Sequence, residues 1–440
     1  MTRYASLRAN APCLRIAMLV ANTGIGDARV MKEAESLFAA GHAVTVFCLA
    51  GFGLPPEELV SGVRYVRLRE WHRGAPAAAF GNGAAPPPNL IRSIKSALAP
   101  FIQHALHAAT FTQPVATFAP DIIHAHDFEC LPAAVSAAGR CGARVIYDMH
   151  ELEEGRLPAA SPLAARWKAH IERRALRRVA ATITVSPSIA SHKARSRGIP
   201  LPTVILNAPR PSAAAPTMPG LRERCGLATA VPLAVYIGNA SQGRGIEQLV
   251  AALGLTPELH LAMLGAIRPA LRPMLEHAVE RLGGRLHLLA PVPHDEVVAH
   301  IASADFGVAT IPGSCLNYEY CLPNKLFEMT LAGLPVLVSR TTELKRFVAE
   351  TGTGIAVDAL DPAAIAQGLR AVYAAREQLA PSGSGLAALR ARYGWQRQAE
   401  HLIALYDAVA RGPRGLPAAM ARRALATTGQ RPRHAFAVGN

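Results

Sequence analysis

Short apolar segments alternate with helical stretches along most of this 440-residue chain. Residues 233–238 (Leu-Ala-Val-Tyr-Ile-Gly) illustrate that these segments are too uniformly hydrophobic to leave one face in water. Strands of this kind are typical of parallel sheets that helices cover on both faces. The pattern predicts strands at residues 15–20, 43–49, 63–68, 122–126, 144–148 and 182–186 in the first half, strands at 203–206, 233–238, 260–265, 285–289, 305–311, 335–339 and 354–357 in the second, and helices at 29–40, 246–253, 270–282 and 365–379.

The strands fall into two groups. They divide almost evenly about Asn207, which favours two doubly wound, Rossmann-like α/β domains over one. The Pro- and Ala-rich segment 207–219 is the natural linker. We therefore expect an N-terminal domain at residues 1–206 and a C-terminal domain at residues 220–393. The helix at residues 394–410 is expected to pack back on the N-terminal domain, and residues 411–440 to form a basic, flexible tail.

Hydropathy and cysteine usage exclude several protein classes. The longest uncharged apolar runs, such as residues 228–238, are too short to span a bilayer. The first apolar segment is also too short for a signal peptide, so we expect a soluble, intracellular protein. The seven cysteines are odd in number and form no CxxC pair. This favours reduced thiols over a disulfide framework or a zinc site.

The formal net charge is +15, and it is concentrated in two segments. Residues 166–178, on an expected helix, contain six Arg or Lys residues, and residues 411–440 contain no acidic residue. Such a balance favours acidic partners, among them an anionic membrane surface, and no nucleic-acid motif accompanies it. Residues 90–111 have apolar residues at helical spacing and could also meet a membrane. The alternatives are a plain solvated basic face and a helix that only covers the first sheet.

A short helix preceded by Pro323 carries the densest set of candidate binding residues. Pro323 and Asn324 lie where a helix start is expected, so free backbone N–H groups there would face an anion. Lys325 adds positive charge beside them, and Glu328, one turn further, can bind a vicinal diol. The segment suits a nucleoside diphosphate, with an ordinary amphipathic helix as the alternative.

Glycine-rich turns follow two of the predicted strands, and ligands of such sheets bind beyond the carboxyl ends of the strands. The loop 238–245 (Gly-Asn-Ala-Ser-Gln-Gly-Arg-Gly) predicts an anion-binding nest with Arg244 placed for a diphosphate. Gly24 and Gly26 form a similar turn after the first strand, but without the third glycine of a dinucleotide fingerprint. A surface arginine and plain turn glycines are the alternatives.

Two other strand ends carry a histidine followed by an acidic residue. These pairs are His126–Asp127 and His150–Glu151. A histidine at this edge can donate to a phosphate or shuttle a proton, and a structural histidine is the alternative.

Taken together, these motifs resemble the retaining glycosyltransferases of family 4 (group 1), which have the GT-B fold and use nucleotide-sugar donors. The likeness extends from the first strand to the helix that contains Tyr406. It implies two Rossmann-like domains that face each other across a cleft. The motifs that carry it are Asp27-Ala-Arg-Val30 with Glu33, Leu37 and Gly41-His-Ala-Val44; Asp121-Ile-Ile-His-Ala-His-Asp127; Val145-Ile-Tyr-Asp-Met-His-Glu151; Tyr236-Ile-Gly-Asn with Gly243-Arg-Gly-Ile-Glu247; and Phe327-Glu-Met-Thr-Leu-Ala-Gly-Leu-Pro-Val336.

The resemblance also implies roles for individual residues. Glu328 would bind the donor ribose, Arg244 and Lys325 would neutralise the diphosphate, and His126 would lie near the transferred sugar. His126, Arg244 and Lys325 are therefore the expected catalytic residues. The other expected donor-binding residues are Gly24, Gly26, Gly238, Asn239, Gly243, Val292, Glu319, Tyr320, Asn324 and Leu326, and the expected acceptor-side residues are Asp127, His150 and Glu151.

The sequence departs from the family pattern at two positions. The family often has two glutamates eight positions apart, and the first would fall at Tyr320, next to Glu319. Asn239 stands where the phosphate loop usually has an arginine, and Arg244 stands where it usually has a lysine. Both departures concern how the sugar and the diphosphate are held.

The resemblance implies sugar transfer with retention at the anomeric carbon, from a UDP- or GDP-sugar to a glycan or lipid-linked acceptor, in cell-envelope or exopolysaccharide synthesis. Cationic side chains and helix-end dipoles would stabilise the charge that develops on the leaving diphosphate. No Asp-x-Asp motif for a divalent ion is present, so we expect neither metal nor cofactor. We expect a cytoplasmic enzyme, with peripheral attachment to the inner face of the cytoplasmic membrane as a further expectation.

Two other functions remain open at this point. A sugar-nucleotide epimerase of the same fold would use additional carboxylates near the crevice, for which Asp127, Glu151 and Glu153 are available. A non-catalytic sugar- or lipid-binding module would need a vestigial diphosphate site, against which Arg244, Lys325 and Glu328 argue.

Overall fold

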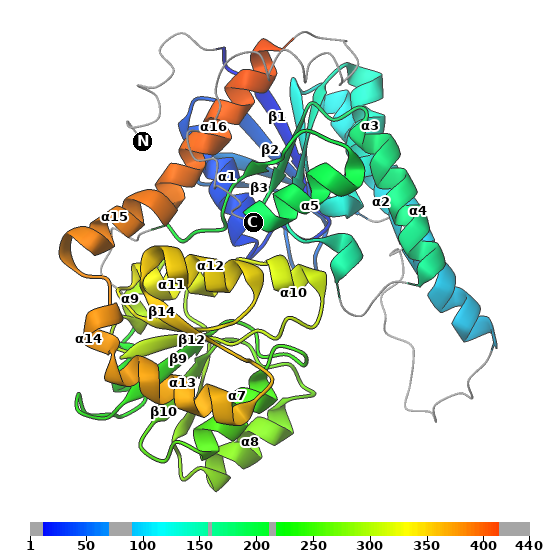
Figure 1. The fold of residues 1–440 in the computed structure, drawn as a ribbon. Helices are drawn as coiled ribbons and strands as arrows, with labels where there is room; N and C mark the ends of the chain where they lie inside the picture. The colour runs from blue at the N-terminus through cyan, green and yellow to red at the C-terminus, as the bar shows by residue number, and fades with distance from the viewer. Residues whose placement is uncertain (1–11, 70–89, 157–160, 211–216, 413–440) are drawn as a thin grey trace.

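The structure is a computed structural model that describes residues 12–69, 90–156, 161–210 and 217–412, with only the backbone described for residues 90–100. It contains two α/β domains, each built on a largely parallel sheet (Figure 1). The fold class expected from the sequence is confirmed.

The N-terminal domain contains an eight-stranded sheet in the order β3-β4-β2-β1-β5-β6-β7-β8. Neighbouring strands are parallel except for the antiparallel pair β3–β4. Ile16 and Met18 of β1 enter one core, whereas Ala17 and Leu19 enter another, because successive side chains of a strand point to opposite faces. The elements are β1 (Arg15–Leu19), α1 (Ala28–Ala39), β2 (Ala43–Leu49), β3 (Glu57–Val60), β4 (Val63–Leu68), α2 (Leu90–Phe118), β5 (Ile122–His126), α3 (Asp127–Cys141), β6 (Arg144–Met149), the 3₁₀ helix η2 (Glu153–Gly155), α4 (Pro162–Leu176), β7 (Ala181–Thr184), α5 (Pro187–Arg197) and β8 (Thr203–Val204).

The C-terminal domain contains a six-stranded, all-parallel sheet in the order β11-β10-β9-β12-β13-β14. It also has a core on each face, with Tyr236 of β9 in one and Val235 in the other. The elements are α6 (Leu221–Arg224), β9 (Leu233–Ile237), α7 (Ile246–Gly254), β10 (His260–Leu264), α8 (Arg272–Arg281), β11 (Leu286–Leu289), α9 (Val297–Ile301), β12 (Phe306–Ala309), α10 (Leu316–Tyr320), α11 (Asn324–Leu331), β13 (Val336–Ser339), α12 (Thr342–Thr351), β14 (Gly354–Val357), α13 (Pro362–Ala374) and α14 (Arg376–Leu379).

The last two helices return the chain to the N-terminal domain. They are α15 (Gly383–Tyr393) and α16 (Trp395–Arg411), and Figure 1 shows α16 lying beside α1 and the first sheet. Trp395 Nε1 donates to Ser36 Oγ of α1 at 2.9 Å, and the Tyr406 hydroxyl lies 2.7 Å from His124 Nδ1 of β5. Both side chains are almost fully buried, so α16 completes the core of the N-terminal domain.

Hydrogen bonds also join the two domains directly. Leu152 N donates to Asn317 Oδ1 of α10 at 2.8 Å. Ser186 Oγ donates to the Tyr320 carbonyl at 2.6 Å, and Ser188 N, in the first turn of α5, donates to Glu343 Oε1 of α12 at 2.6 Å. These bonds hold the carboxyl ends of β6 and β7 against α10 and α12.

The elements differ from the sequence predictions in three places. The strand expected at residues 203–206 is shorter, since β8 covers only Thr203–Val204; it pairs with β7 in the first sheet, within the N-terminal domain expected at residues 1–206. The exposed edge strand β3 was not predicted, because its glutamates hide the apolar pattern on which the predictions depend. The helix expected at residues 365–379 is divided into α13 and α14.

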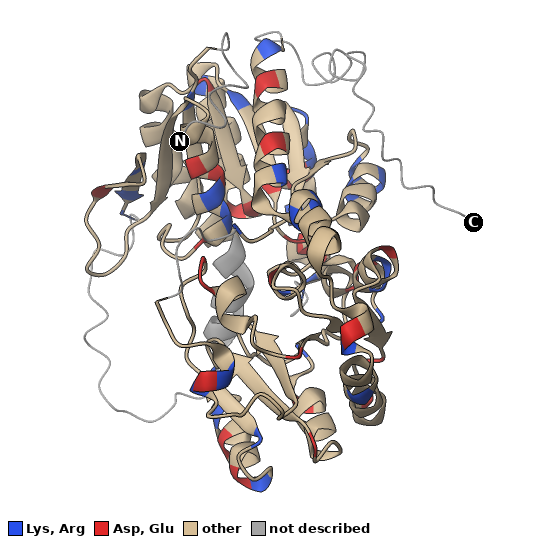
Figure 2. Cartoon of the chain, turned by 90° about the vertical axis from the view of Figure 1, so that its left-hand side faces the viewer, with Lys and Arg blue, Asp and Glu red and all other residues tan. Residues whose placement is uncertain are grey.

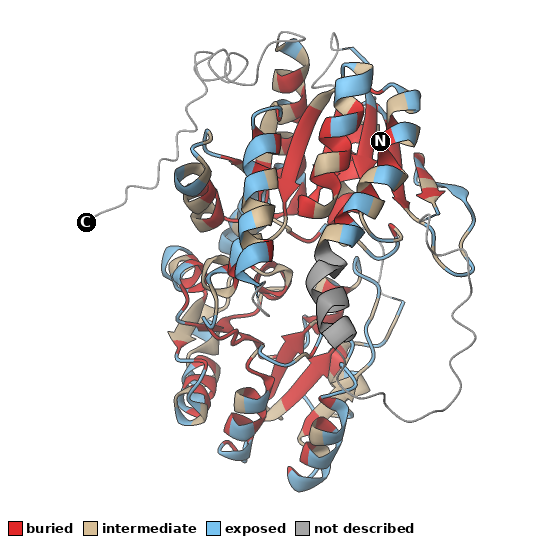
Figure 3. Ribbon diagram, turned by 90° about the vertical axis from the view of Figure 1, so that its right-hand side faces the viewer, coloured by how far each residue is buried: buried red, intermediate tan, exposed pale blue. Residues whose placement is uncertain are grey.

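Burial and charge are segregated as a layered fold requires. The central strands of both sheets are buried, whereas the outer faces of the helices are exposed (Figure 3). Charged side chains lie chiefly on helices and loops, and the central strands carry few of them (Figure 2). Among the helices that the structure describes, none has both the length and the hydropathy needed to cross a bilayer.

Candidate functional site

Lys325 is a buried cation at the carboxyl edge of the second sheet. It lies in the first turn of α11, which begins after Pro323 as expected from the sequence. Its Nζ lies 3.6 Å from the centroid of the Tyr236 ring, and the side chain is only 6% exposed. The Nζ has no hydrogen-bond partner among the described residues. A Cβ added at Gly238 would lie 3.9 Å from this atom, so Lys325 faces the loop after β9.

That loop brings Arg244 to the same place. Gly238, Gly243 and Gly245 all have positive φ, and Gly245 is the N-cap of α7, with no room for a side chain against the Thr310 carbonyl. Arg244 is half-buried and makes no hydrogen bond or ion pair with the described part of the chain. Burial, together with the positive charge of Arg244, lowers the pKa of Lys325 to about 7. Two neighbouring cations without an acidic hydrogen-bond partner form a site for an anion.

Glu328 lies one turn further along α11 and is 8% exposed. Burial raises the pKa of its carboxyl, against the opposing charges of Lys32 and Lys325. Lys32 belongs to α1 of the N-terminal domain, so Glu328 faces that domain. No described donor bonds to the Glu328 carboxylate, which leaves both oxygens available to ligand hydroxyls.

The Gly24–Gly26 turn lies at the equivalent edge of the first sheet. Asn22 Oδ1 accepts from Gly24 N at 2.7 Å, and Asn22 Nδ2 donates to Asp27 Oδ2 at 2.9 Å. Asp27 in turn caps α1 by accepting from Val30 N. A Cβ at Gly24 would press on Tyr65 and Cys48, whereas one at Gly26 would meet nothing within 4 Å. The turn is therefore pinned at Gly24 and open beside Gly26.

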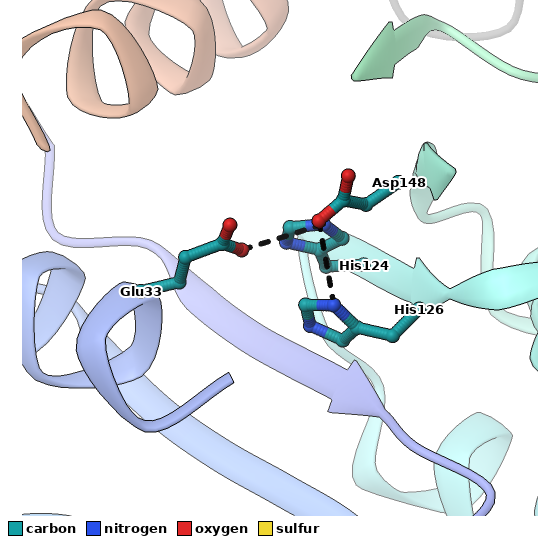
Figure 4. A group of neighbouring side chains, drawn as sticks. All are labelled: Glu33, His124, His126 and Asp148. Carbon is teal, nitrogen blue, oxygen red and sulfur yellow. Dashed lines mark ion pairs between the residues drawn. The ribbon is translucent and has the colours of Figure 1, made fainter. Parts of the chain in front are cut away.

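A buried charged cluster lies under the carboxyl ends of β5 and β6. Figure 4 shows Glu33, His124, His126 and Asp148 converging on one point. Arg29 of α1 supplies the positive charge, with Nε 2.8 Å from Asp148 Oδ2 and 3.1 Å from Glu33 Oε1. Burial raises the pKa of Glu33, and burial together with His126 keeps the pKa of His124 well below its ordinary value.

The same four side chains could hold a metal ion by distance alone, since their ligand atoms all lie within 4.8 Å of one another. Arg29, however, already forms two hydrogen bonds to Asp148, at 2.8 and 3.0 Å. A divalent cation would have to share this carboxylate with the guanidinium at short range. The donor set is therefore better explained by Arg29 as its resident cation.

His150 and Asp127 extend this cluster towards the surface. His150 lies between Asp127 and Asp148, and its Nε2 is 3.1 Å from His126 Nδ1. Glu151 instead pairs with Arg156 at 2.7 Å, and burial raises its pKa, with the charges of Arg156 and, more weakly, Arg244 opposing. Since Arg244 belongs to the C-terminal domain, the acceptor-side loop faces the phosphate loop.

Several expected donor-binding residues have structural partners. Glu319 Oε1 accepts from Thr342 N at 2.9 Å and from its hydroxyl at 2.5 Å at the start of α12. The Tyr320 ring lies 6.0 Å from His192 and packs against the small core around Leu152. In the part of the chain that the structure describes, neither side chain forms a hydrogen bond or ion pair with Lys325 or Arg244.

The remaining expected donor-binding residues contribute backbone or packing. Leu326 is fully buried and its amide donates to the Pro323 carbonyl at 3.0 Å, so this amide is not free for an anion. Val292 is half-buried against the core of the C-terminal domain. The Asn239 carbonyl lies 3.5 Å from the Tyr236 hydroxyl, and Asn324 is half-buried at the start of α11.

Sequence reasoning assigned no role to Arg29, Glu33, His124 or Asp148. One feature of the sequence could have pointed to this cluster. Arg29 and Glu33 stand at i, i+4 on a helix that packs on a sheet, and two charged side chains on a buried helix face need partners. Asp148 was seen only as the last residue of a strand.

Comparisons with known proteins agree with this architecture. The model for the glycosyl transferase 4-like domain matches residues 24–208, and the model for glycosyl transferases group 1 matches residues 231–375. The fold is that of the GT-B glycosyltransferases. The chain belongs to the group 1 glycosyltransferases of this fold.

Individual relatives are more distant. A D-inositol 3-phosphate glycosyltransferase of Xylanimonas cellulosilytica is 30% identical over 191 residues, which are 42% of this chain and 44% of that protein, so less than half of the relative is matched. The solved sucrose-phosphate synthase of Thermosynechococcus elongatus superposes with a TM-score of 0.68 at 20% identity, covering 89% of this chain and 98% of the other. HepE of Anabaena, solved in complex with UDP, superposes with a TM-score of 0.62 at 16% identity. This match covers 89% of this chain and 99% of HepE. At these identities the structural matches support the fold alone.

Proposed function

We propose that this protein transfers a sugar from a nucleoside-diphosphate sugar to a glycan or lipid-linked acceptor, with retention at the anomeric carbon. The proposal rests on the buried Lys325 Nζ at the carboxyl edge of the second sheet, which lies near Arg244 and has no hydrogen-bond partner among the described residues. An enzyme that cleaves a glycosyl–phosphate bond needs such uncompensated cations where negative charge develops.

Each residue group then has a defined task. Lys325 and Arg244 neutralise the diphosphate, most strongly as it leaves, and the start of α11 adds its dipole. Glu328 accepts from the ribose hydroxyls. His126 lies on the opposite domain, near the transferred sugar. The departing phosphate takes the proton of the acceptor hydroxyl, which attacks from the same face.

A uridine nucleotide is the first donor to test. HepE of Anabaena, which shares this fold, has been solved with UDP, with UDP and glucose, and with UDP-glucose. Because Arg244 and Lys325 supply two positive charges, we propose that the donor binds without a divalent ion.

The first experiment is calorimetry of the full chain with UDP, GDP and ADP in the presence of EDTA. We expect one of the three to bind with 1:1 stoichiometry and without added metal. Lys345→Met, which removes an exposed lysine on α12, is the control and should bind equally well. If none of the three binds, the proposed diphosphate site is wrong. If binding requires a divalent ion, the proposal that the donor binds without metal is wrong.

Analysis of the reaction products distinguishes a sugar transferase from an epimerase and from a module that only binds the donor. Incubation with the bound nucleotide's sugar donors should release the nucleoside diphosphate and, with an acceptor, an α- or β-linked product that keeps the donor's anomeric configuration. Conversion of the donor to an epimer, with no diphosphate released at that stage, would favour the epimerase alternative. Tight binding without turnover on any donor would favour the binding module.

We also propose peripheral attachment to an anionic membrane, because α4 carries an unpaired basic stripe. Arg166 and Arg173 lie on one face of α4, Arg177 follows at the C-cap of this helix, and all three are exposed and form no ion pair among the described residues. Each surface cation contributes about 1 kcal/mol near an anionic bilayer, in a salt-sensitive manner. Of the other two segments expected to meet a membrane, the side chains of residues 90–100 and the basic tail at 413–440 lie outside the described residues.

Co-sedimentation with vesicles tests this attachment. We expect binding to phosphatidylserine vesicles at low salt, loss of binding at high salt, and little binding to phosphatidylcholine vesicles. The triple variant Arg166→Gln, Arg173→Gln, Arg177→Gln should weaken binding by more than tenfold. The matched triple on α8 and the loop before it, Arg268→Gln, Arg272→Gln, Arg281→Gln, should not. Equal behaviour of the two triple variants would contradict a role for α4.

A further inference from the structure

The imidazole of His150 is held between two carboxylates from different segments. Its Nδ1 lies 3.2 Å from Asp127 Oδ2, and its Nε2 lies 3.1 Å from Asp148 Oδ2. The backbone N of His150 also donates to Asp127 Oδ1 at 3.2 Å. Asp127 has a φ of 60°, a left-handed conformation that is uncommon for a residue with a side chain. The fold therefore maintains a strained residue whose carboxylate contacts His150 twice.

A histidine with an acceptor at both ring nitrogens must donate from both, which makes it an imidazolium. Charge balance agrees with this, because Arg29 matches the carboxylate of Asp148 while Asp127 has no other described cationic partner within ion-pair distance. Burial would lower the pKa of His150, but Asp127 and Asp148 outweigh it and raise this pKa well above its ordinary value. His150 thus stays charged across the neutral range.

The charge on His150 has a consequence for His126. The two rings meet at 3.1 Å, between His126 Nδ1 and His150 Nε2. If His150 carries a proton on Nε2, then His126 Nδ1 has to accept. We propose that the clamped His150 imidazolium fixes His126 as the tautomer protonated on Nε2, and so presents one N–H donor to the transferred sugar.

The competing arrangement would have His126 Nδ1 donate to Asp148. That separation is 3.6 Å, beyond an ordinary N–H···O bond, whereas the contact with His150 is within range. With His150 protonated on Nε2, it would also place two N–H donors, His126 Nδ1 and His150 Nε2, in contact at 3.1 Å. The geometry therefore disfavours it.

The Nε2 atom of His126 is the group that this clamp makes available. His126 is 1% exposed, and its Nε2 has no hydrogen-bond partner among the described residues. A buried N–H without a partner is costly in the absence of a ligand. It becomes favourable when a substrate oxygen accepts from it. In this role His150 and Asp127 are positioning residues, and the catalytic consequence rests on the proposed function.

The tautomer can be measured without turnover. Long-range ¹H–¹⁵N correlation spectra of the full chain labelled with ¹⁵N-histidine distinguish a protonated ring nitrogen from an unprotonated one, and the His126 signals are identified by their loss in His126→Gln. We expect Nε2 protonated and Nδ1 unprotonated in His126, and both nitrogens protonated in His150 at neutral pH. A proton on His126 Nδ1 would overturn the proposal, whatever the enzyme activity.

Variants of His150 then test the consequence for turnover. His150→Leu removes the donor and should lower kcat by about 10- to 100-fold, the range seen when an orienting partner is removed, while the Kd for UDP or the nucleotide found to bind stays unchanged. His150→Gln keeps an N–H donor near the Nε2 position and should restore the His126 tautomer and most of kcat. The control His287→Leu removes a comparable histidine pair, 3.0 Å apart on β10 and β11, and should leave kcat unchanged.

The outcomes separate two failures. If His150→Leu keeps the wild-type kcat in an active enzyme, the positioning role is wrong while the proposed function stands. If no donor is turned over by the wild type, the proposed function fails, and the spectra of the wild type still decide the tautomer.

Discussion

Replacing Lys325 with methionine is expected to lower the turnover number by about 100- to 1,000-fold, the usual effect of removing one group that stabilises developing negative charge. Methionine has nearly the length of lysine and suits a side chain that is 6% exposed against the Tyr236 ring. The fold should therefore persist. Steady-state kinetics should show a larger fall in kcat than rise in KM, because the charge is needed most as the bond to phosphate breaks.

Donor binding should depend on pH through the same residue. The pKa of Lys325 is lowered to about 7 by burial and by Arg244, so the amine is partly neutral at pH 7 in the empty site. A bound diphosphate favours the ammonium form and raises this pKa, so affinity should fall as the pH rises above about 7. Calorimetry between pH 6.5 and 9 should show this decline in the wild type and its absence in Lys325→Met.

The variant Lys345→Met, which replaces an exposed lysine, again serves as the control. It should keep both the turnover and the pH dependence of the wild type. A Lys325→Met enzyme with wild-type turnover would contradict a role for Lys325 in stabilising the leaving diphosphate. An unchanged pH dependence in that variant would assign the titration to another group.

Much of the site could be predicted because it depends on local patterns. Strand ends appear in the sequence as apolar runs that stop at glycine, and the parallel arrangement places those ends at one edge of the sheet. Lys325 and Arg244 both lie next to β9 or its neighbours for this reason. Pro323 has no amide hydrogen and disfavours a helical residue before it, so the start of α11 at Asn324 was also predictable.

The rest depends on contacts between distant segments. Glu319 has the right chemistry for a sugar hydroxyl, but its carboxylate bonds to Thr342, which the sequence does not place beside it. Arg29 and Asp148 are 119 positions apart, and their pairing follows only from how α1 packs on the first sheet.

Replacing Arg29 with methionine is expected to destabilise the N-terminal domain by about 3–5 kcal/mol, the cost of removing one partner of a buried ion pair. Arg29 is 2% exposed, and its guanidinium bonds twice to Asp148 and once to the Ile205 carbonyl. Without it, the buried Asp148 carboxylate loses its main cation. Urea unfolding followed by tryptophan fluorescence measures this, because Trp395 packs in the same domain.

A matched pair of variants distinguishes loss of charge balance from loss of volume. Arg64→Met removes an arginine that is half-exposed and paired with Glu57 on the edge of the sheet, and should change stability by no more than about 1 kcal/mol. The double variant Arg29→Met, Asp148→Asn should be more stable than Arg29→Met alone, because the second change removes the uncompensated charge that the first one exposes. If the double variant is instead less stable by the sum of the two single effects, the contribution of Arg29 lies in its packing and in its bond to Ile205, and Asp148 does not depend on it for charge.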